Sequence, residues 1–252
     1  MKRILAIGNS FSDDATARLA ALCRAGGSDA EIDNLYIGGC SLERHRNNFV
    51  SGEKAYRLDF NGVSQEAPVS VNEMVERGPW DIITLQQVSG QSGRWESYLP
   101  YLDEVVAAVR EKAPKAELWI HETWAYETDS DHPDFAFYDR DQEKMADCIR
   151  EAYAKAAERI GAKVIPCGEV IRALRKTAPF DYANGGISLC RDGFHMNLVY
   201  GRYALACTWY ECFIGDVRNN PYVPADDADP ALLAMIREMA HDRVDGGRGT
   251  KL

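Results

Sequence analysis

The sequence predicts an α/β protein: a three-layer α/β/α sandwich in which helices cover both faces of a central, mostly parallel five-stranded sheet. Short apolar runs that fit buried strands alternate with helical patterns along the whole chain. Such alternation implies right-handed crossovers between parallel strands. The 252 residues contain no linker-like or low-complexity stretch, which favours one domain with a flexible tail at about 244–252.

Five segments have the length and apolar character of sheet strands. They are residues 4–7, 31–37, 80–85, 117–121 and 162–166. Helical periodicity predicts helices from 13 to about 25 and over 71–77, 95–112, 141–159, 168–176, 196–214 and 231–241. The polar stretch 40–51 is expected to be an irregular loop. Asn61-Gly62, between residues 55–60 and 63–67, predicts a small β-hairpin insertion.

The composition excludes several classes of partner. A net charge of −10 and a pI near 5.1 disfavour nucleic acid and anionic membranes, which would repel the chain. Seven cysteines without a C-x-x-C pair indicate neither a disulfide framework nor a zinc site. The four apolar residues after position 3 are too few for a signal-peptide core. We therefore expect a cytoplasmic protein without cofactor, metal, nucleic-acid or membrane partner.

The segment 3–15 (RILAIGNSFSDDA) places Ser10 just after the first strand and just before the first helix. A serine there can be a nucleophile presented by a sharp turn. It can also be the N-cap of the helix, with Asp13 completing a weak capping box. This segment alone leaves both interpretations open. Asp13 and Asp14 are typical of a helix start rather than of a metal site.

Asp192 and His195 lie three residues apart, so one short segment can supply an imidazole base and the carboxylate that orients it. Ser10 would then supply the nucleophile from the other end of the chain. Ligands of parallel sheets bind at the carboxyl ends of the strands. The segments that follow the predicted strands, together with the loop before His195, should therefore meet in one crevice.

Short blocks of this chain resemble those of the SGNH (GDSL-type) hydrolase superfamily. The first is 8–12 (GNSFS), where that superfamily usually has Gly-Asp-Ser-Leu. The second is 39–41 (GCS) and the fourth is 192–195 (DGFH). The resemblance implies a triad of Ser10, Asp192 and His195. It also implies that the Gly39 N–H, with Gly38 as second choice, binds the oxyanion together with the Ser10 N–H.

The third block departs from the superfamily, which has Gly-x-Asn-Asp where this chain has LQQVS at 85–89. A glutamine amide can donate the hydrogen bond of the missing asparagine. We expect Gln87 to be this oxyanion donor, although Gln86 remains an alternative. The chain is therefore similar to a branch of the superfamily with glutamine at this place.

Three further residues follow the fourth predicted strand at the same edge of the sheet. Glu122, Trp124 and Tyr126, with Gln86, are candidates for a wall that binds a sugar or an acyl group. Simple packing explains the three equally well. His121, at the end of that strand, is expected to be a core histidine.

The resemblance and the residues together favour a serine esterase acting on a small O-acyl group, such as an acetyl on a carbohydrate or other small substrate. A lipase or thioesterase with the same triad is the first alternative, but no apolar acyl channel is evident. A catalytically silent glycan-binding module is the second, prompted by the glutamine in the third block. Nucleotide binding is disfavoured because Asp13 and Asp14 would repel phosphate.

Overall fold

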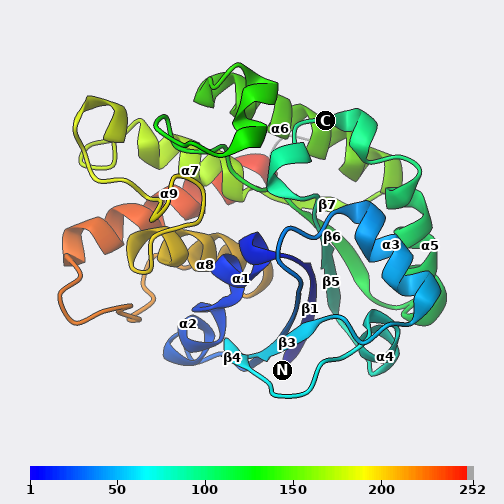
Figure 1. The fold of residues 1–252 in the computed structure, drawn as a ribbon. Helices are drawn as coiled ribbons and strands as arrows, with labels where there is room; N and C mark the ends of the chain where they lie inside the picture. Colours follow the sequence, from blue (N-terminus) through cyan, green and yellow to red (C-terminus); the bar gives the residue numbers. More distant parts are fainter. Residues whose placement is uncertain (249–252) are drawn as a thin grey trace.

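The central sheet has seven strands in the order β4-β3-β2-β1-β5-β6-β7 (Figure 1). The computed structural model describes residues 1–248. The strands are β1 (Lys2–Gly8), β2 (Ala30–Tyr36), β3 (Arg57–Phe60), β4 (Val63–Ser64), β5 (Ile82–Leu85), β6 (Glu117–His121) and β7 (Lys163–Ile165). β2, β1, β5, β6 and β7 run parallel, and they are the five strands that the sequence predicts.

Strand β1 lies in the middle of the sheet, and residues 4–7 are at most 1% exposed. A parallel strand is buried on both faces, so its sequence is a continuous apolar run rather than an alternation. The helices that bury the two faces confirm the expected three-layer architecture.

The predicted hairpin forms at Asn61 and Gly62, whose φ angles of 50° and 78° suit a tight two-residue turn between paired strands. It is not a separate insertion. β3 pairs antiparallel with β2, and β4 pairs antiparallel with β3. The hairpin therefore extends the sheet from the expected five strands to seven.

Helices α1, α2, α8 and α9 lie on one side of the sheet, and α3, α4 and α5 lie on the other (Figure 1). The helices are α1 (Ser10–Thr16), α2 (Leu19–Ala25), α3 (Leu42–Ser51), α4 (Val71–Glu76), α5 (Tyr101–Lys112), α6 (Gln142–Ile160), α7 (Cys167–Arg175), α8 (Tyr200–Phe213) and α9 (Pro230–Arg248). Of the expected tail, 244–248 continue α9, and 249–252 lie outside the described residues. Within residues 1–248, no helix has both the length and the apolar character needed to cross a membrane.

Several helix boundaries differ from the prediction. The expected loop over 40–51 is wrong, because α3 occupies most of it. Ser41 caps this helix by accepting a hydrogen bond from the Arg44 N–H, and its buried side includes His45 and Asn48. These buried polar residues conceal the helical period. The first predicted helix is divided into α1 and α2, while α5 and α8 begin only at residues 101 and 200.

The carboxyl ends of the parallel strands lie side by side. Gly8 is in register with Tyr36, Leu85 with Ile120, and His121 with Ile165. The segments that follow these strands therefore start from one edge of the sheet, as the sequence predicts.

The turn of the hairpin generates a prediction about stability. A Cβ on Gly62 would lie 2.7 Å from the carbonyl oxygen of Ala17, and its φ is positive. Gly27 also has positive φ, but a Cβ there would meet nothing within 4 Å. Gly27→Ala should lower the free energy of unfolding by about 1–2 kcal/mol, the cost of left-handed backbone. Gly62→Ala should lower it by about 1–3 kcal/mol more because of the clash. Urea unfolding measures both, and equal losses would contradict the close approach.

Candidate active site

Asp192 and His195 form a hydrogen-bonded pair. Asp192 Oδ2 lies 2.7 Å from His195 Nδ1, and Oδ1 accepts the backbone N–H of His195 at 2.8 Å. Burial raises the pKa of Asp192, but the hydrogen bonds from the His195 ring and backbone outweigh it and hold this pKa below its ordinary value. The carboxylate therefore stays ionised at neutral pH and favours the imidazole tautomer with its proton on Nδ1, in which Nε2 can accept a proton.

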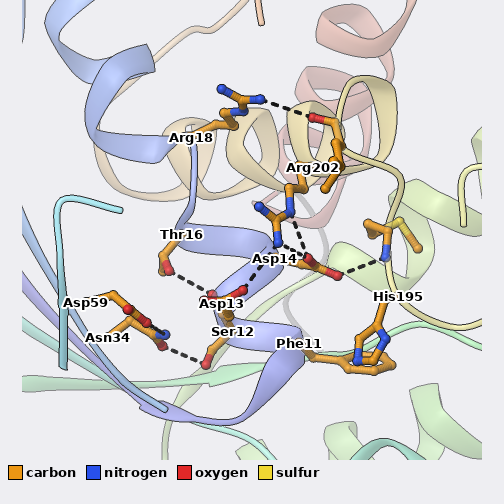
Figure 2. Close-up of polar contacts among 12 residues, drawn as sticks. Phe11, Ser12, Asp13, Asp14, Thr16, Arg18, Asn34, Asp59, His195 and Arg202 are labelled. Atoms are coloured by element: carbon orange, nitrogen blue, oxygen red, sulfur yellow. Dashed lines mark hydrogen bonds and ion pairs between the residues drawn. The ribbon is translucent and has the colours of Figure 1, made fainter. Parts of the chain in front are cut away.

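Ser10 is the first residue of α1, and Asn9 rather than Ser10 is the N-cap. Asn9 Oδ1 accepts the N–H of Phe11 at 3.0 Å. The His195 ring lies beside that of Phe11, with 6.0 Å between centroids (Figure 2). Among residues 1–248, no hydrogen bond joins Ser10 to His195. The fold thus brings the imidazole next to the start of α1, and catalytic hydrogen bonds commonly tighten only when substrate binds.

A row of buried polar side chains crosses the strand ends and includes Asn9, the residue before Ser10. His121 Nδ1 lies 2.7 Å from Gln86 Oε1, and Gln86 Nε2 donates to Asn9 Oδ1 at 2.8 Å. Asn9 Nδ2 then donates to the carbonyl of Cys40 at 3.0 Å. The row links the ends of β6, β5 and β1 to the loop after β2. Gln86 therefore supports the site from below, and its expected place in a substrate wall is wrong because the side chain is 2% exposed.

The hydrogen bond from Asn9 to Cys40 also anchors the loop that carries Gly39 beside the start of α1. Gly39 is exposed and has a φ of 61°, a conformation that glycine adopts without strain. Gly38 is exposed as well. The main chain of this loop is thus placed at the surface, close to Asn9 and Ser10.

The Gln87 amide does not face this crevice, which corrects its expected role as an oxyanion donor. Its Nε2 donates to the carbonyl and hydroxyl of Ser97 at 3.0 and 3.1 Å. Its Oε1 accepts the N–H groups of Leu42 and Val88, both at 2.9 Å. The side chain is fully buried and joins the segment after β5 to the start of α3.

The expected wall of Glu122, Trp124 and Tyr126 is also wrong, because all three side chains are buried. Tyr126 bonds to the hydroxyl of Ser89 at 2.9 Å. Glu122 Oε1 accepts the N–H of Glu169 in α7 at 3.0 Å. These two residues pack inside the molecule rather than line a surface.

Trp124 connects two parts of the site. Its ring stacks on Phe11 with 4.1 Å between centroids, and its Nε1 donates to the carbonyl of Phe194 at 2.8 Å. One indole thus touches the residue after Ser10 and the residue before His195. Its position three residues beyond the end of β6 gives no sequence signal that separates this role from ordinary packing.

Residues 190–196, which we call the DGFH loop, are held from several sides. Within the loop, the Arg191 N–H donates to the carbonyl of His195 at 2.9 Å. The Glu127 N–H donates to the carbonyl of Gly193 at 2.7 Å. Asp14 of α1 accepts the N–H of Met196 at 2.8 Å. Sequence reasoning missed Glu127 and Asp14, because their partners lie far away along the chain.

A polar cavity of about 310 Å³ opens beside Asp192 and Gly193. Its lining includes the carboxylates of Asp129 and Asp131 and the side chain of Tyr182. The Tyr182 hydroxyl donates to Asp129 at 2.7 Å. The cavity is therefore suited to polar groups. It shares Asp192 with the candidate site, whereas Ser10 and His195 do not line it.

One group of side chains has the composition of a metal site, within the part of the chain that the structure describes. It consists of Glu211, Asp216 and His241, whose ligand atoms lie within 4.8 Å of one another. Asp216 already pairs with Arg218 at 2.5 Å. The group belongs to the α8–α9 region and shares no residue with the candidate site.

Burial raises the pKa of Glu122 to about 8, so the folded protein keeps this carboxyl protonated at neutral pH. The unfolded chain loses that proton near pH 4.3. Between these values the folded state binds more protons, and its stability falls as pH rises. Glu122→Gln should therefore gain stability relative to wild type from about pH 5 to 8, by up to about 1.4 kcal/mol per pH unit. Urea unfolding across this range measures the difference, and a constant difference would contradict the buried neutral acid.

Comparisons with known proteins agree with this architecture. The profile of the family described as Domain of unknown function (DUF4886) matches residues 3–242. No curated protein matches the chain. A DUF4886 family protein from Bacteroides uniformis ATCC 8492 is 36% identical, with a TM-score of 0.91, over 99% of this chain and 97% of that one.

More distant structures share the fold. A proposed SGNH hydrolase from Slackia heliotrinireducens is 19% identical, with a TM-score of 0.56, over 83% of this chain and 97% of that one. A catalytic mutant of Axe2, an acetylxylan esterase from Geobacillus stearothermophilus, is 14% identical, with a TM-score of 0.55, over 83% and 93%. The chain therefore belongs to the DUF4886 family, and its fold is that of the SGNH hydrolases.

Proposed function

We propose that the protein is a serine esterase whose triad is Ser10, His195 and Asp192. The observation that carries this proposal is the 2.7 Å hydrogen bond between Asp192 and His195, in a loop bonded to the helix that begins with Ser10. The fold shared with SGNH hydrolases supports the same reading.

In the proposed reaction, Ser10 Oγ forms a bond to the ester carbonyl carbon while its proton passes to His195 Nε2. The tetrahedral intermediate collapses, the ester C–O bond breaks, and His195 returns the proton to the departing alcohol. Water then attacks the acyl group with His195 again as base, which releases the acid and restores Ser10.

The oxyanion is proposed to accept hydrogen bonds from the N–H groups of Ser10 and Gly39. The Ser10 N–H lies at the start of α1, where the helix dipole favours negative charge. The Asn9–Cys40 hydrogen bond holds the Gly39 loop nearby. One such donor is worth about 3–4 kcal/mol of transition-state stabilisation.

The proposed substrate is a small O-acyl ester, such as an acetyl group on a carbohydrate. The cavity beside Asp192 supports this choice, because its carboxylates and hydroxyls suit sugar hydroxyls and disfavour an apolar chain. The acetylxylan esterase of the same fold acts on a substrate of this class.

Ser10→Ala should lower kcat for p-nitrophenyl acetate on the order of 10⁴-fold or more, because no other group replaces the nucleophile. The melting temperature should stay near that of wild type. A fluorophosphonate probe should label the wild-type protein, and mass spectrometry should locate the adduct on Ser10. Equal hydrolysis by both proteins would reject the proposal.

A series of p-nitrophenyl esters tests the acyl group. With a polar site, kcat/KM should be higher for the two-carbon ester than for the eight-carbon ester. The reverse preference would favour a lipase or thioesterase with the same triad.

A catalytically silent glycan-binding module is the second candidate. The observation in its favour is that the Gln87 amide is bonded to Ser97, which leaves two main-chain donors for the oxyanion. Binding of acetylated oligosaccharides without hydrolysis, together with no fluorophosphonate labelling, would support this module over the esterase.

A further inference from the structure

We propose that Asp14 is a positioning residue that sets the distance between Ser10 and His195. This inference rests on the proposed function and adds a residue to it. Asp14 touches no reacting group. It acts by holding the DGFH loop against the helix that carries the nucleophile.

The side chain of Asp14 is fully buried, yet every part of its carboxylate is bonded. Oδ2 accepts the N–H of Met196 at 2.8 Å, and Oδ1 accepts Nε of Arg202 at 2.8 Å (Figure 2). Arg191 Nη1 lies 3.0 and 3.2 Å from the two oxygens. A buried charge is tolerated only when it is paired and hydrogen-bonded in this way.

The partners of Asp14 flank the proposed base and its carboxylate. Met196 directly follows His195, and Arg191 directly precedes Asp192. Arg191 Nη1 also bonds to the carbonyl of Met196, which closes the loop on itself. One carboxylate therefore holds both ends of the Asp192–His195 segment.

The spacing of Ser10 and Asp14 along α1 makes the bonds from Asp14 to the DGFH loop relevant to catalysis. Residues four apart in a helix lie on the same face, separated by a rise of about 6 Å. One turn of helix thus separates the nucleophile from the carboxylate that holds the main chain next to the base. A misplacement of about 1 Å at a reacting group can cost about 100-fold in rate.

A simpler interpretation is that Asp14 only stabilises the packing of α1 against α8. Asp13 offers a matched control, because it also pairs with Arg202, at 3.3 Å, and with Arg57, at 2.5 Å. Its side chain is 27% exposed, and neither Arg57 nor Arg202 belongs to the DGFH loop. Asp13→Asn therefore removes one charge from the same cluster without loosening the hold on His195.

The experiment compares wild type, Asp14→Asn and Asp13→Asn with p-nitrophenyl acetate, at a temperature where circular dichroism shows all three folded. Asp14→Asn should lower kcat and the rate of fluorophosphonate labelling by about 10- to 100-fold, with KM within about threefold of wild type. Asp13→Asn should keep kcat within about threefold, whatever its loss of melting temperature.

The pH profile gives a readout that a loss of stability would not move. The kcat/KM of wild type and Asp13→Asn should reach a plateau as pH rises, because a positioned imidazole serves as the base. That of Asp14→Asn should continue to rise, because hydroxide replaces an imidazole that no longer reaches Ser10.

Equal kcat losses in the two variants, or losses that follow melting temperature, would overturn the positioning role while leaving the esterase intact. An inactive, unlabelled wild type would overturn the esterase and this role together.

If Asp14→Asn does not fold, Arg191→Gln tests the same contact by removing the partner of Asp14 in the DGFH loop. The Arg191 side chain is 33% exposed, so its loss is easier to accommodate. A lowered kcat at constant KM supports the role, and an unchanged kcat overturns it.

Discussion

A buried carboxylate has to be neutralised where it lies, and Asp14 meets this requirement with groups from the far end of the chain. Arg191 is 177 residues away in sequence, Met196 is 182 and Arg202 is 188. Removing one partner of a buried charge typically costs about 3–5 kcal/mol. The amino-terminal helix and the DGFH loop therefore belong to one cooperative unit. The candidate site is therefore complete only when the two ends of the chain have met.

The second constraint is the layer of polar side chains beneath the site. Parallel strands end in a region closed to water on both faces, so each buried polar group there needs a protein partner. His121 Nδ1, Gln86 and Asn9 are hydrogen-bonded in a row that ends on the carbonyl of Cys40, while the buried Nε2 of His121 has no partner among the described residues. Gln87 does the same between Leu42 and Ser97. Gln86 and Gln87 are therefore structural connectors in this chain.

The parts of the fold that depend on local pattern could be predicted from the sequence. Apolar runs located the five parallel strands, Asn61-Gly62 located a hairpin, and the spacing of Asp192 and His195 indicated a hydrogen-bonded pair. The prediction failed where polar side chains are buried, because the helical pattern was sought in apolar residues. α3 buries His45 and Asn48, so its pattern resembles a loop. The directions of Gln87 and Trp124, and the partners of Asp14, depend on segments that only the tertiary structure brings together.

The hairpin that widens the sheet also determines how the sheet ends. In residues 1–248, the outermost strands are β4, with two residues, and β7, with three. An open sheet edge is a template for strand addition by a neighbouring chain, and brief outer strands are one way in which proteins blunt it. Either edge of this sheet offers an incoming strand only a few main-chain groups. Intermolecular β-pairing, which is the first step toward fibrous aggregates, is therefore disfavoured.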